Sequence, residues 1–446
     1  MTNHFFSIFD IASALFILLL IVVHSFWVRH RHSQEAHYRY FLPSVYFKLF
    51  FALGYSLFYI IYYNGGGDTI AYWDGAVKLN DLFYSSPHNY FAEIFSSSES
   101  LSITEHFNQA TGYPPRWIYS EPESWLVCKI FSVVIIAGFK GYLAVTFLLA
   151  YLAHYASWKL FEIILGYKLH REWLLAVATL FIPSVSFWCS GLSKDTLLYI
   201  AMLFFIVSFF RILQRRNGYA AIVICSLLLL LIRPVMFVAV ITPLAFAFSA
   251  QMIRKKTGSP ALRAAALGIA FAFVTFILLF IFTNGEIIES DTLQNMISEA
   301  AIVQNDFMNN QTYGENRYFL DINDYTVIGM FKSTPAAVIA GLYRPFLWES
   351  LTPSLILNGI ESIFFIWVTI RFFIRKNLRE RIRFIRRHEL LVYVFLAMLF
   401  IAFFSGYTSI IFGVLVRIRS YALPLLLIIL FADSRQQEQI PTRPEE

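Results

Sequence analysis

The sequence predicts an all-α, polytopic membrane protein, and its composition carries this prediction. Hydrophobic residues make up 58% of the 446 residues and charged residues 14%, against roughly 45–50% and 25% in soluble globular proteins. The mean hydropathy is +0.60. A soluble chain of this length, which would form about three domains, needs many more polar residues to cover its surface. Soluble, disordered, collagen-like and disulfide-scaffold proteins are therefore excluded.

A transmembrane helix needs about 20 apolar residues, and the chain offers about eleven segments that approach this length. The clear segments are 5–27, 41–63, 141–165, 196–212, 262–283, 353–374 and 389–405. The shorter segments are 173–189, 218–232, 235–252 and 420–433. They predict a single transmembrane domain over residues 1–433, followed by a short cytoplasmic tail at 434–446.

Clusters of Lys and Arg predict the orientation, because such clusters mark the cytoplasmic face of a membrane protein. If all of them lie inside, the N-terminus lies outside and the C-terminus inside. The clusters are Arg29/Arg31/Arg39, Lys168/Arg171, Arg211/Arg215/Arg216, Arg254/Lys255/Lys256 and the run at 371–387.

One apolar segment, 125–139, is short and contains Lys129. A crossing there would reverse the side of most later basic loops, so we expect a re-entrant or juxtamembrane helix on the outer side. The same topology leaves two long outer loops, at 64–124 and 284–352. Loops this long in a compact protein are usually functional.

The first candidate site follows the second predicted span, where three glycines let the backbone turn sharply beside a ligand. Asp68 and Asp74 are the predicted catalytic carboxylates, and Tyr72 and Trp73 are predicted to bind substrate. On a helix, Asp68 and Asp74 would lie on nearly opposite faces, so a close carboxylate pair is not expected. The structural alternative is a turn, a helix that begins near Asp68, and an interfacial belt of aromatic residues.

The second candidate site lies between two apolar segments, in the sequence SGLSKD. Lys194 and Asp195 are predicted to bind substrate, because a lysine at this depth needs an anion or a carboxylate partner. In the structural alternative, Ser193 caps the next helix and Asp195 lies near the positive end of that helix.

Arginines at the ends of spans form the third candidate site. Arg233 precedes a proline at the tip of a predicted hairpin of two short apolar segments, where proline breaks the helix. Arg344 repeats the Arg-Pro pair with Glu349 close behind, and Arg417 and Arg419 border the last span. We expect this set to bind substrate, because arginine matches phosphate oxygens in a bidentate fashion. The alternative is a set of interfacial arginines paired with acids of the loops.

No cofactor and no metal site are predicted. Cys128, Cys189 and Cys225 lie at uneven spacing in apolar stretches and are expected to be core residues. Asp321 and Asp324 can touch a divalent metal, although a solvated loop explains them as well. The net charge is +6. In a membrane protein the distribution of Lys and Arg matters more than this sum, because it marks the cytoplasmic face and does not indicate a nucleic-acid partner.

Three motifs resemble bacterial multi-pass glycosyltransferases and polymerases of surface-polysaccharide assembly: GGGDTIAYWDGA after a span, SGLSKD between spans, and the late FGVLVRIRSYALP. These families include the O-antigen-polymerase-like, exopolysaccharide-polymerase-like and GT-C proteins. The resemblance implies a polyprenyl-(pyro)phosphate-linked sugar donor, a glycan or lipid acceptor, and other polysaccharide-assembly proteins as partners. It also implies a bacterial cytoplasmic membrane with the active site on its outer side.

In GT-C enzymes a catalytic acid lies early in the first large outer loop, which is the position of Asp68, and juxtamembrane helices such as 125–139 often follow. The chain departs from the GT-C pattern in two respects, since its first loop has no close pair of acids and only a short tail follows the last span. Its arginines suit the polymerase branch better.

The mechanism expected from this resemblance gives Asp68 the role of general base for the acceptor hydroxyl. Lys194 and the arginines would stabilise the departing phosphate. A competing hypothesis is a transporter or flippase for an anionic or lipid-linked glycan, because short and broken helices also build transport sites. A flippase would leave its substrate chemically unchanged.

Overall fold

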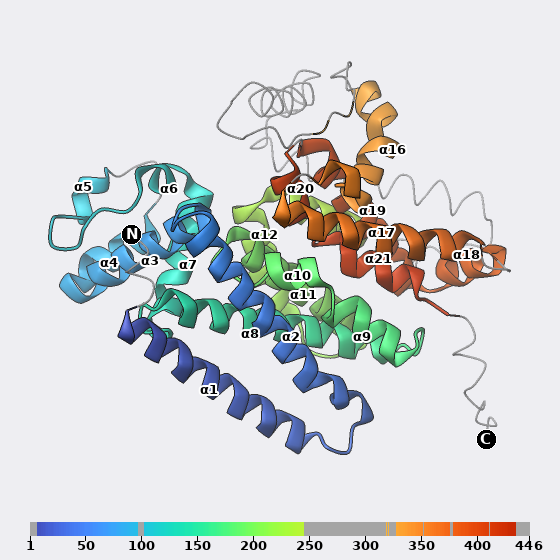
Figure 1. Cartoon of the computed structure of the whole chain (residues 1–446), viewed down its shortest axis with the longest axis horizontal. Coiled ribbons are helices and arrows are strands. Elements are labelled where there is room, and N and C mark those ends of the chain that lie inside the picture. Colours follow the sequence, from blue (N-terminus) through green and yellow to red (C-terminus); the bar gives the residue numbers. More distant parts are fainter. Residues whose placement is uncertain are drawn as a thin grey trace. The chain divides into compact units, whose positions relative to one another are not determined.

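The computed structural model describes residues 7–96, 102–244, 318, 320, 327–350, 352–374, 378–409 and 411–433. Every regular element in these ranges is a helix (Figure 1). The chain divides into two compact units, which are described separately below. Unit 1 comprises residues 1–163 and 179–234, and unit 2 comprises residues 164–178 and 235–446.

Five helical segments of the described chain are long and apolar enough to cross a membrane, and two bent helix pairs raise the number to seven if each pair is one span. This fits a helical membrane protein. The five segments are Ile8–Arg31, Ala36–Tyr62, Lys194–Leu213, Leu355–Ile374 and Glu389–Thr408. The bent pairs are Pro122–Ala137 with Tyr142–Leu165, at 104°, and Phe412–Arg419 with Ala422–Leu430, at 54°.

Helix α1 (Ile8–Arg31) illustrates the membrane character of these segments. Side chains such as Phe9, Leu15 and Leu19 are more than half exposed along it. A continuous apolar surface of this kind is rare on soluble monomers, whereas lipid chains would cover it. Basic residues in the last turn follow the apolar stretch, as expected at the end of a span.

Among the described residues, the long apolar helices are fewer than the eleven predicted spans. The predicted span 262–283 lies outside the described residues, and 235–252 is described only as the helix Pro234–Leu244. Helix α12 (Tyr219–Ile232), at 14 residues, is too short by itself for a full crossing. In the part of the chain that the structure describes, hydropathy alone therefore overestimates the number of long helices.

The predicted span 173–189 is two short helices, α9 (Glu172–Leu180) and α10 (Pro183–Trp188). Pro183 takes the first position of α10. A proline there has no N–H to continue the preceding helix and disfavours the helical conformation of the residue before it. Ile182 accordingly has an extended backbone. The prediction of one continuous span was wrong, because the segment is apolar on both sides of Pro183 and its hydropathy does not reveal the break.

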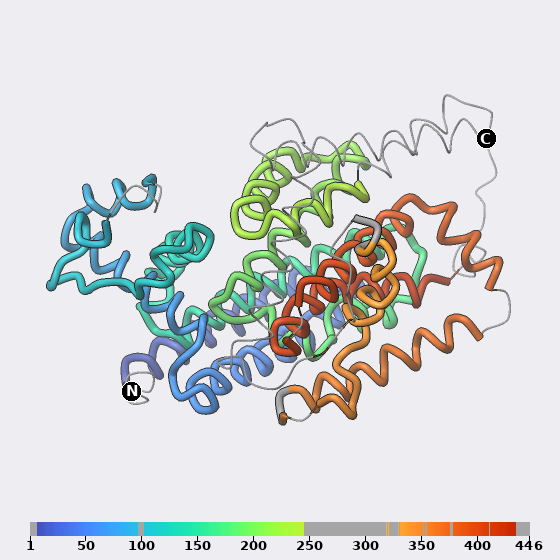
Figure 2. Tube along the Cα trace, turned by 90° about the horizontal axis from the view of Figure 1, so that it is seen from above, coloured from blue at the N-terminus to red at the C-terminus, as the bar shows by residue number. Residues whose placement is uncertain are grey.

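Unit 1 continues from α2 (Phe41–Leu57) and the single π-helical turn η3 (Phe58–Tyr62) into the segment predicted as the first outer loop. This segment is largely helical. It contains α3 (Asp68–Ser85), α4 (Pro87–Phe95), α5 (Ile103–His106) and α6 (Arg116–Ser120), and it leads into α7 (Pro122–Ala137), α8 (Tyr142–Leu165) and, later, α11 (Lys194–Leu213). Figure 2 shows the helices from α3 to α7 gathered together, light blue to teal.

Unit 2 contains α16 (Val327–Tyr343), η5 (Leu347–Glu349), α17 (Pro353–Ile374), α18 (Leu378–Arg387), α19 (Glu389–Thr408), α20 (Phe412–Arg419) and α21 (Ala422–Leu430). Helix α16 occupies the end of the segment predicted as the second outer loop, and the rest of that loop before residue 327 lies almost entirely outside the described residues.

Helices α16 and α19 pack backbone against backbone. A Cβ atom on Gly341 would lie 1.9 Å from the carbonyl oxygen of Ala402, and one on Gly406 would lie 1.9 Å from that of Ala337. The contact is reciprocal, with small residues four apart on both helices. Such pairs of small residues let membrane helices approach closely.

We expect Gly341→Ala to destabilise this packing, because backbone atoms of α19 would have to shift to admit one methyl group. Overpacking of this kind typically lowers the free energy of unfolding by about 1–3 kcal/mol. Thermal unfolding of the purified protein in detergent measures the effect. Gly413→Ala in α20 is the matched control, since nothing lies within 4 Å of its added Cβ. Equal midpoints for the two variants would contradict the close contact.

Candidate functional site

The first candidate site begins where the chain turns from η3 into α3. Gly65 and Gly67 both have positive φ, at 72° and 88°. A Cβ on Gly67 would also lie 2.9 Å from the ring of Tyr59, so glycine is needed there for both conformation and space. This turn places Asp68 as the first residue of α3, half-buried in the first helical turn. The predicted turn and helix start are confirmed.

Helix α3 packs against α7 through a small residue. A Cβ on Gly75 would lie 2.8 Å from the sulfur of Cys128. The Cys128 thiol lies 3.7 Å from the backbone carbonyl of Tyr72, to which it donates a weak hydrogen bond. Tyr72 is buried, while Trp73 is half-buried and donates from Nε1 to the carbonyl of Lys140 at 2.9 Å. The two predicted aromatic residues therefore fix α3 in place.

Asp74 is the half-buried carboxylate of this helix pair. Desolvation raises the pKa of its carboxyl group above the ordinary value; Lys78 opposes this shift and Asp81 adds to it. A carboxyl group with a raised pKa is better suited to accept or donate a proton near neutral pH than an ordinary exposed one.

Lys194 begins α11 and is held by two carboxylates at the start of α7, the N-cap residue Glu121 and Glu123 in the first turn. Its Nζ lies 3.3 Å from Oε1 of Glu123 and 3.7 Å from Oε2 of Glu121. The lysine side chain is 15% exposed, whereas the two glutamates are 42% and 48% exposed. The prediction that this lysine needs an anionic partner is confirmed, although the sequence did not identify the partner.

The structural alternative for the neighbouring residues is confirmed as well. Ser193 caps α11, with its Oγ accepting from the backbone N–H of Thr196 at 3.2 Å. Asp195 is buried in the first turn, where a carboxylate is favoured by the helix dipole.

Helix α7 connects the surroundings of Asp74 with those of Lys194. It packs against α3 at Cys128, beside Gly75, and Glu123 in its first turn lies 3.3 Å from Nζ of Lys194. The α3–α7–α11 site, as we name the surroundings of Asp74, Cys128 and Lys194, thus holds a desolvated carboxylate and an ammonium group within unit 1. It joins the first and second predicted sites.

Arg233 belongs to the same unit. It is the C-cap of α12, and the helix Pro234–Leu244 follows, so the predicted break at the Arg-Pro pair is confirmed. Its Nη1 is buried and has no hydrogen-bond partner in the part of the chain that the structure describes. Helix α12 packs against both α7 and α11.

The remaining predicted arginines lie in unit 2 and contact protein groups. Arg419 is fully buried; its Nη1 donates to the carbonyl of Arg344 and to Oγ of Ser362, both at 2.7 Å, and its Nη2 lies 3.7 Å from Glu361. Arg344 lies 3.4 Å from Glu349. This matches the alternative of arginines paired with acids.

Arg417, on the same helix as Arg419, is half-buried. The structure thus does not gather all five predicted basic residues within one unit. Lys194 and Arg233 belong to unit 1, and Arg344, Arg417 and Arg419 to unit 2.

Sequence reasoning missed a buried polar cavity in unit 1. The cavity measures about 10 Å³, roughly the space of one water molecule. Its polar lining comes from Lys48, His154, Ser157, Thr179, Ser186 and Tyr199. The ammonium of Lys48 donates to the carbonyl of Val185 at 3.2 Å and lies 5.6 Å from the ring centre of Tyr199. The available signal was the lone charge of Lys48 within an apolar segment.

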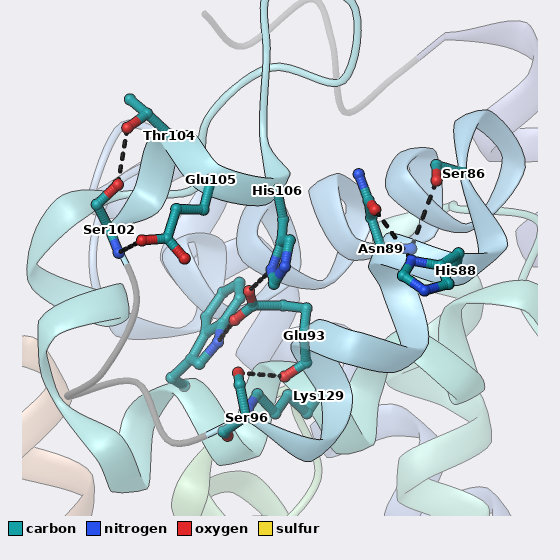
Figure 3. Close-up of polar contacts among 11 residues, drawn as sticks. Ser86, His88, Asn89, Glu93, Ser96, Ser102, Thr104, Glu105, His106 and Lys129 are labelled. Atoms are coloured by element: carbon teal, nitrogen blue, oxygen red, sulfur yellow. Dashed lines mark hydrogen bonds and ion pairs between the residues drawn. The ribbon is translucent and has the colours of Figure 1, made fainter.

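A second polar cluster was also missed. Glu93 is fully buried; it accepts from Trp125 Nε1 at 2.8 Å and lies 2.7 Å from Nδ1 of His106. Lys129 donates to the carbonyl of Ser96 at 2.8 Å (Figure 3). These bonds tie α4 and α5 to α7 and give Lys129, in the segment predicted as a re-entrant or juxtamembrane helix, a polar partner. The 104° bend after α7 is compatible with a broken span or a re-entrant segment.

Among the described residues, no group of three or more His, Cys, Asp or Glu side chains is placed to hold a metal ion. Asp321 and Asp324 lie outside the described residues. Comparison with protein-family models, with curated proteins and with solved structures finds no match to this chain.

We expect Lys48→Met to leave the thermal unfolding midpoint unchanged or to raise it. The substitution removes a buried charge, which is expensive to desolvate, and loses one hydrogen bond worth about 1 kcal/mol. Lys159→Met is the control, because it removes a partly exposed lysine paired with Glu162 at 2.7 Å, a kind of pair worth about 0–1 kcal/mol. A large fall for Lys48→Met alone would mean that the buried ammonium stabilises the fold.

Proposed function

We propose that this protein is a membrane glycosyltransferase or polymerase that uses a polyprenyl-(pyro)phosphate-linked sugar to assemble a cell-surface glycan. The observation that carries the proposal is the α3–α7–α11 site, where α7 packs beside the half-buried carboxylate of Asp74 at Gly75 and holds the ammonium of Lys194 through Glu123. Glycosyl transfer from a phosphate needs both kinds of group, a proton acceptor and a positive charge. The orientation predicted from the basic clusters, with about eleven spans and the N-terminus outside, would put this site on the outer side of a bacterial cytoplasmic membrane.

Asp74 is the proposed general base. The acceptor hydroxyl oxygen attacks the anomeric carbon while its proton passes to the Asp74 carboxylate, and the bond from that carbon to the phosphate oxygen breaks. The raised pKa of Asp74 makes the carboxylate a stronger proton acceptor than an ordinary aspartate. Asp68 is half-buried six residues earlier on α3 and remains the second predicted carboxylate of the site.

Lys194 and Arg233 are the proposed partners of the leaving phosphate, which carries away the electron pair of the broken bond. The Lys194 ammonium is a point charge, and the buried Nη1 of Arg233 has no hydrogen-bond partner among the described residues. Fixed positive groups that face a developing negative charge are usually the largest single contribution to such catalysis. A phosphate would displace Glu121 and Glu123 as the ion-pair partners of Lys194, since both glutamates are much more exposed than the lysine.

A flippase for a lipid-linked glycan is the second candidate function. The bent pair α7–α8, at 104°, supports it, because discontinuous helices commonly form binding sites in transporters. The two functions differ in their product, since a flippase releases the lipid-linked glycan unaltered on the other side of the membrane.

We expect Asp74→Asn to reduce glycosyl transfer by about 10²–10⁴-fold, the usual contribution of a general base. The assay follows the mass of polyprenyl-linked glycans incubated with purified protein in liposomes. Asp81→Asn, assayed at a pH above the acid limb of the rate profile, is the matched control on the same helix and should keep its transfer rate, since Asp81 pairs with Lys140 at 2.5 Å near the surface. Movement of intact lipid-linked glycan across the bilayer, with no change of mass, would favour the flippase. Full transfer by Asp74→Asn would remove Asp74 from the mechanism.

The rate of transfer should fall as the pH drops through the raised pKa of Asp74, because only the deprotonated carboxylate accepts a proton. Lys78 lowers this pKa and Asp81 raises it. Lys78→Met should therefore move the acid limb of the pH–rate profile to higher pH, and Asp81→Asn should move it to lower pH. Shifts in the same direction, or none, would assign the acid limb to another group.

A further inference from the structure

Helix α18 carries a row of exposed arginines that the proposed function does not use. It lies in unit 2 between α17, which ends at Ile374, and α19, which begins at Glu389. Arg379, Arg383 and Arg387 are exposed and four residues apart. This spacing places them on one face of the helix.

The other side of α18 is anchored to its neighbours. Phe384 is buried, and the guanidinium of Arg381 lies 4.7 Å from the ring centre of Phe372 in α17. Arg381 also donates to the carbonyl of Ala432 at 3.4 Å. The helix therefore presents its arginine row in a fixed orientation.

The row is not neutralised from within the described chain. No ion pair of Arg379, Arg383 or Arg387 occurs in the ranges that the structure describes, and Glu380 is the one acid in the sequence of α18. Like charges four residues apart destabilise a helix. A surface that supplies several negative charges at once would relieve this repulsion.

The position of the arginine row on α18 indicates which kind of negatively charged surface it contacts. Phe373 and Ile374, the last residues of the candidate span in α17, are 57% and 78% exposed, so an apolar, lipid-facing surface reaches the start of the basic segment. Arginines directly beyond such a surface lie at the depth of lipid headgroups. Arginine also binds phosphate oxygens in a bidentate fashion.

We propose that the exposed face of α18 binds the headgroups of anionic phospholipids through Arg379, Arg383 and Arg387. The ligand is the lipid phosphate surface itself, and the interaction positions unit 2 at the membrane surface independently of any glycan chemistry. Each arginine near an anionic surface contributes enough for several-fold tighter binding, so three contribute on the order of 100-fold.

The test titrates phosphatidylglycerol or phosphatidylcholine into the full-length protein in neutral detergent and measures bound lipid by native mass spectrometry. We expect the wild type to prefer phosphatidylglycerol, with an affinity that falls as salt rises. Arg379→Gln/Arg383→Gln/Arg387→Gln should weaken this binding by on the order of 100-fold. The charge-matched control is Arg211→Gln/Arg215→Gln/Arg216→Gln, which removes three exposed arginines in the last turn of α11 and just beyond it and should change the affinity only a few-fold.

Three outcomes would overturn the proposal: no preference of the wild type for phosphatidylglycerol, an unchanged affinity in the α18 variant, or an equal loss in the control. Binding of soluble polyglutamate to α18 without a preference for phosphatidylglycerol would also overturn it in favour of a soluble polyanion. If the glutamine variant does not fold, the triple Arg→Lys variant retains the charge and should keep most of the binding, and its complete loss would contradict the electrostatic basis.

Discussion

The scarcity of water around a buried charge governs the arrangement of polar side chains in this protein. A charged group inside a membrane protein must find its partner in the protein, because no solvent is there to replace it. Arg419 meets this requirement with a backbone carbonyl, a hydroxyl group and the carboxylate of Glu361. Lys48 meets it with a carbonyl and the face of an aromatic ring. These contacts join segments that are far apart in the sequence.

The sequence could predict those parts of the fold that depend on local apolar composition. Long apolar stretches predict spans because hydropathy is a local property, and five of the predicted spans correspond to long apolar helices. Breaks such as the one before Pro183 depend on a single residue within an apolar stretch. The close packing of Gly341 against Ala402 depends on a helix that is distant in the sequence. Neither feature changes the local hydropathy, so the prediction of eleven spans missed them.

For the candidate site, the sequence identified which groups need partners but not what the partners are. Lys194 was predicted to need an anion, and it contacts two glutamates at the N-terminal end of α7, one of them the N-cap residue. Those glutamates lie some seventy residues earlier, in a segment whose polar residues carry no pattern that points to a lysine. Asp74 and Asp68 were both identified by their position after a span. Only the packing of the helices shows that Gly75, next to Asp74, lies against Cys128 of α7, and that the same helix contacts Lys194 through Glu123.

Lys194 and Arg419 differ in how exposed their carboxylate partners are. Glu121 and Glu123 are nearly half exposed, and ion pairs with such partners contribute only about 0–1 kcal/mol. A phosphate that carries more negative charge can therefore replace them on Lys194 at little expense. Arg419 is fully buried and Glu361 is only 10% exposed. Removing one partner from such a buried pair typically costs about 3–5 kcal/mol, so a ligand has little access to Arg419 and little to gain from it. On this argument Lys194 can exchange its glutamate partners for a phosphate ligand, whereas Arg419 has a structural role and holds α20 against α17.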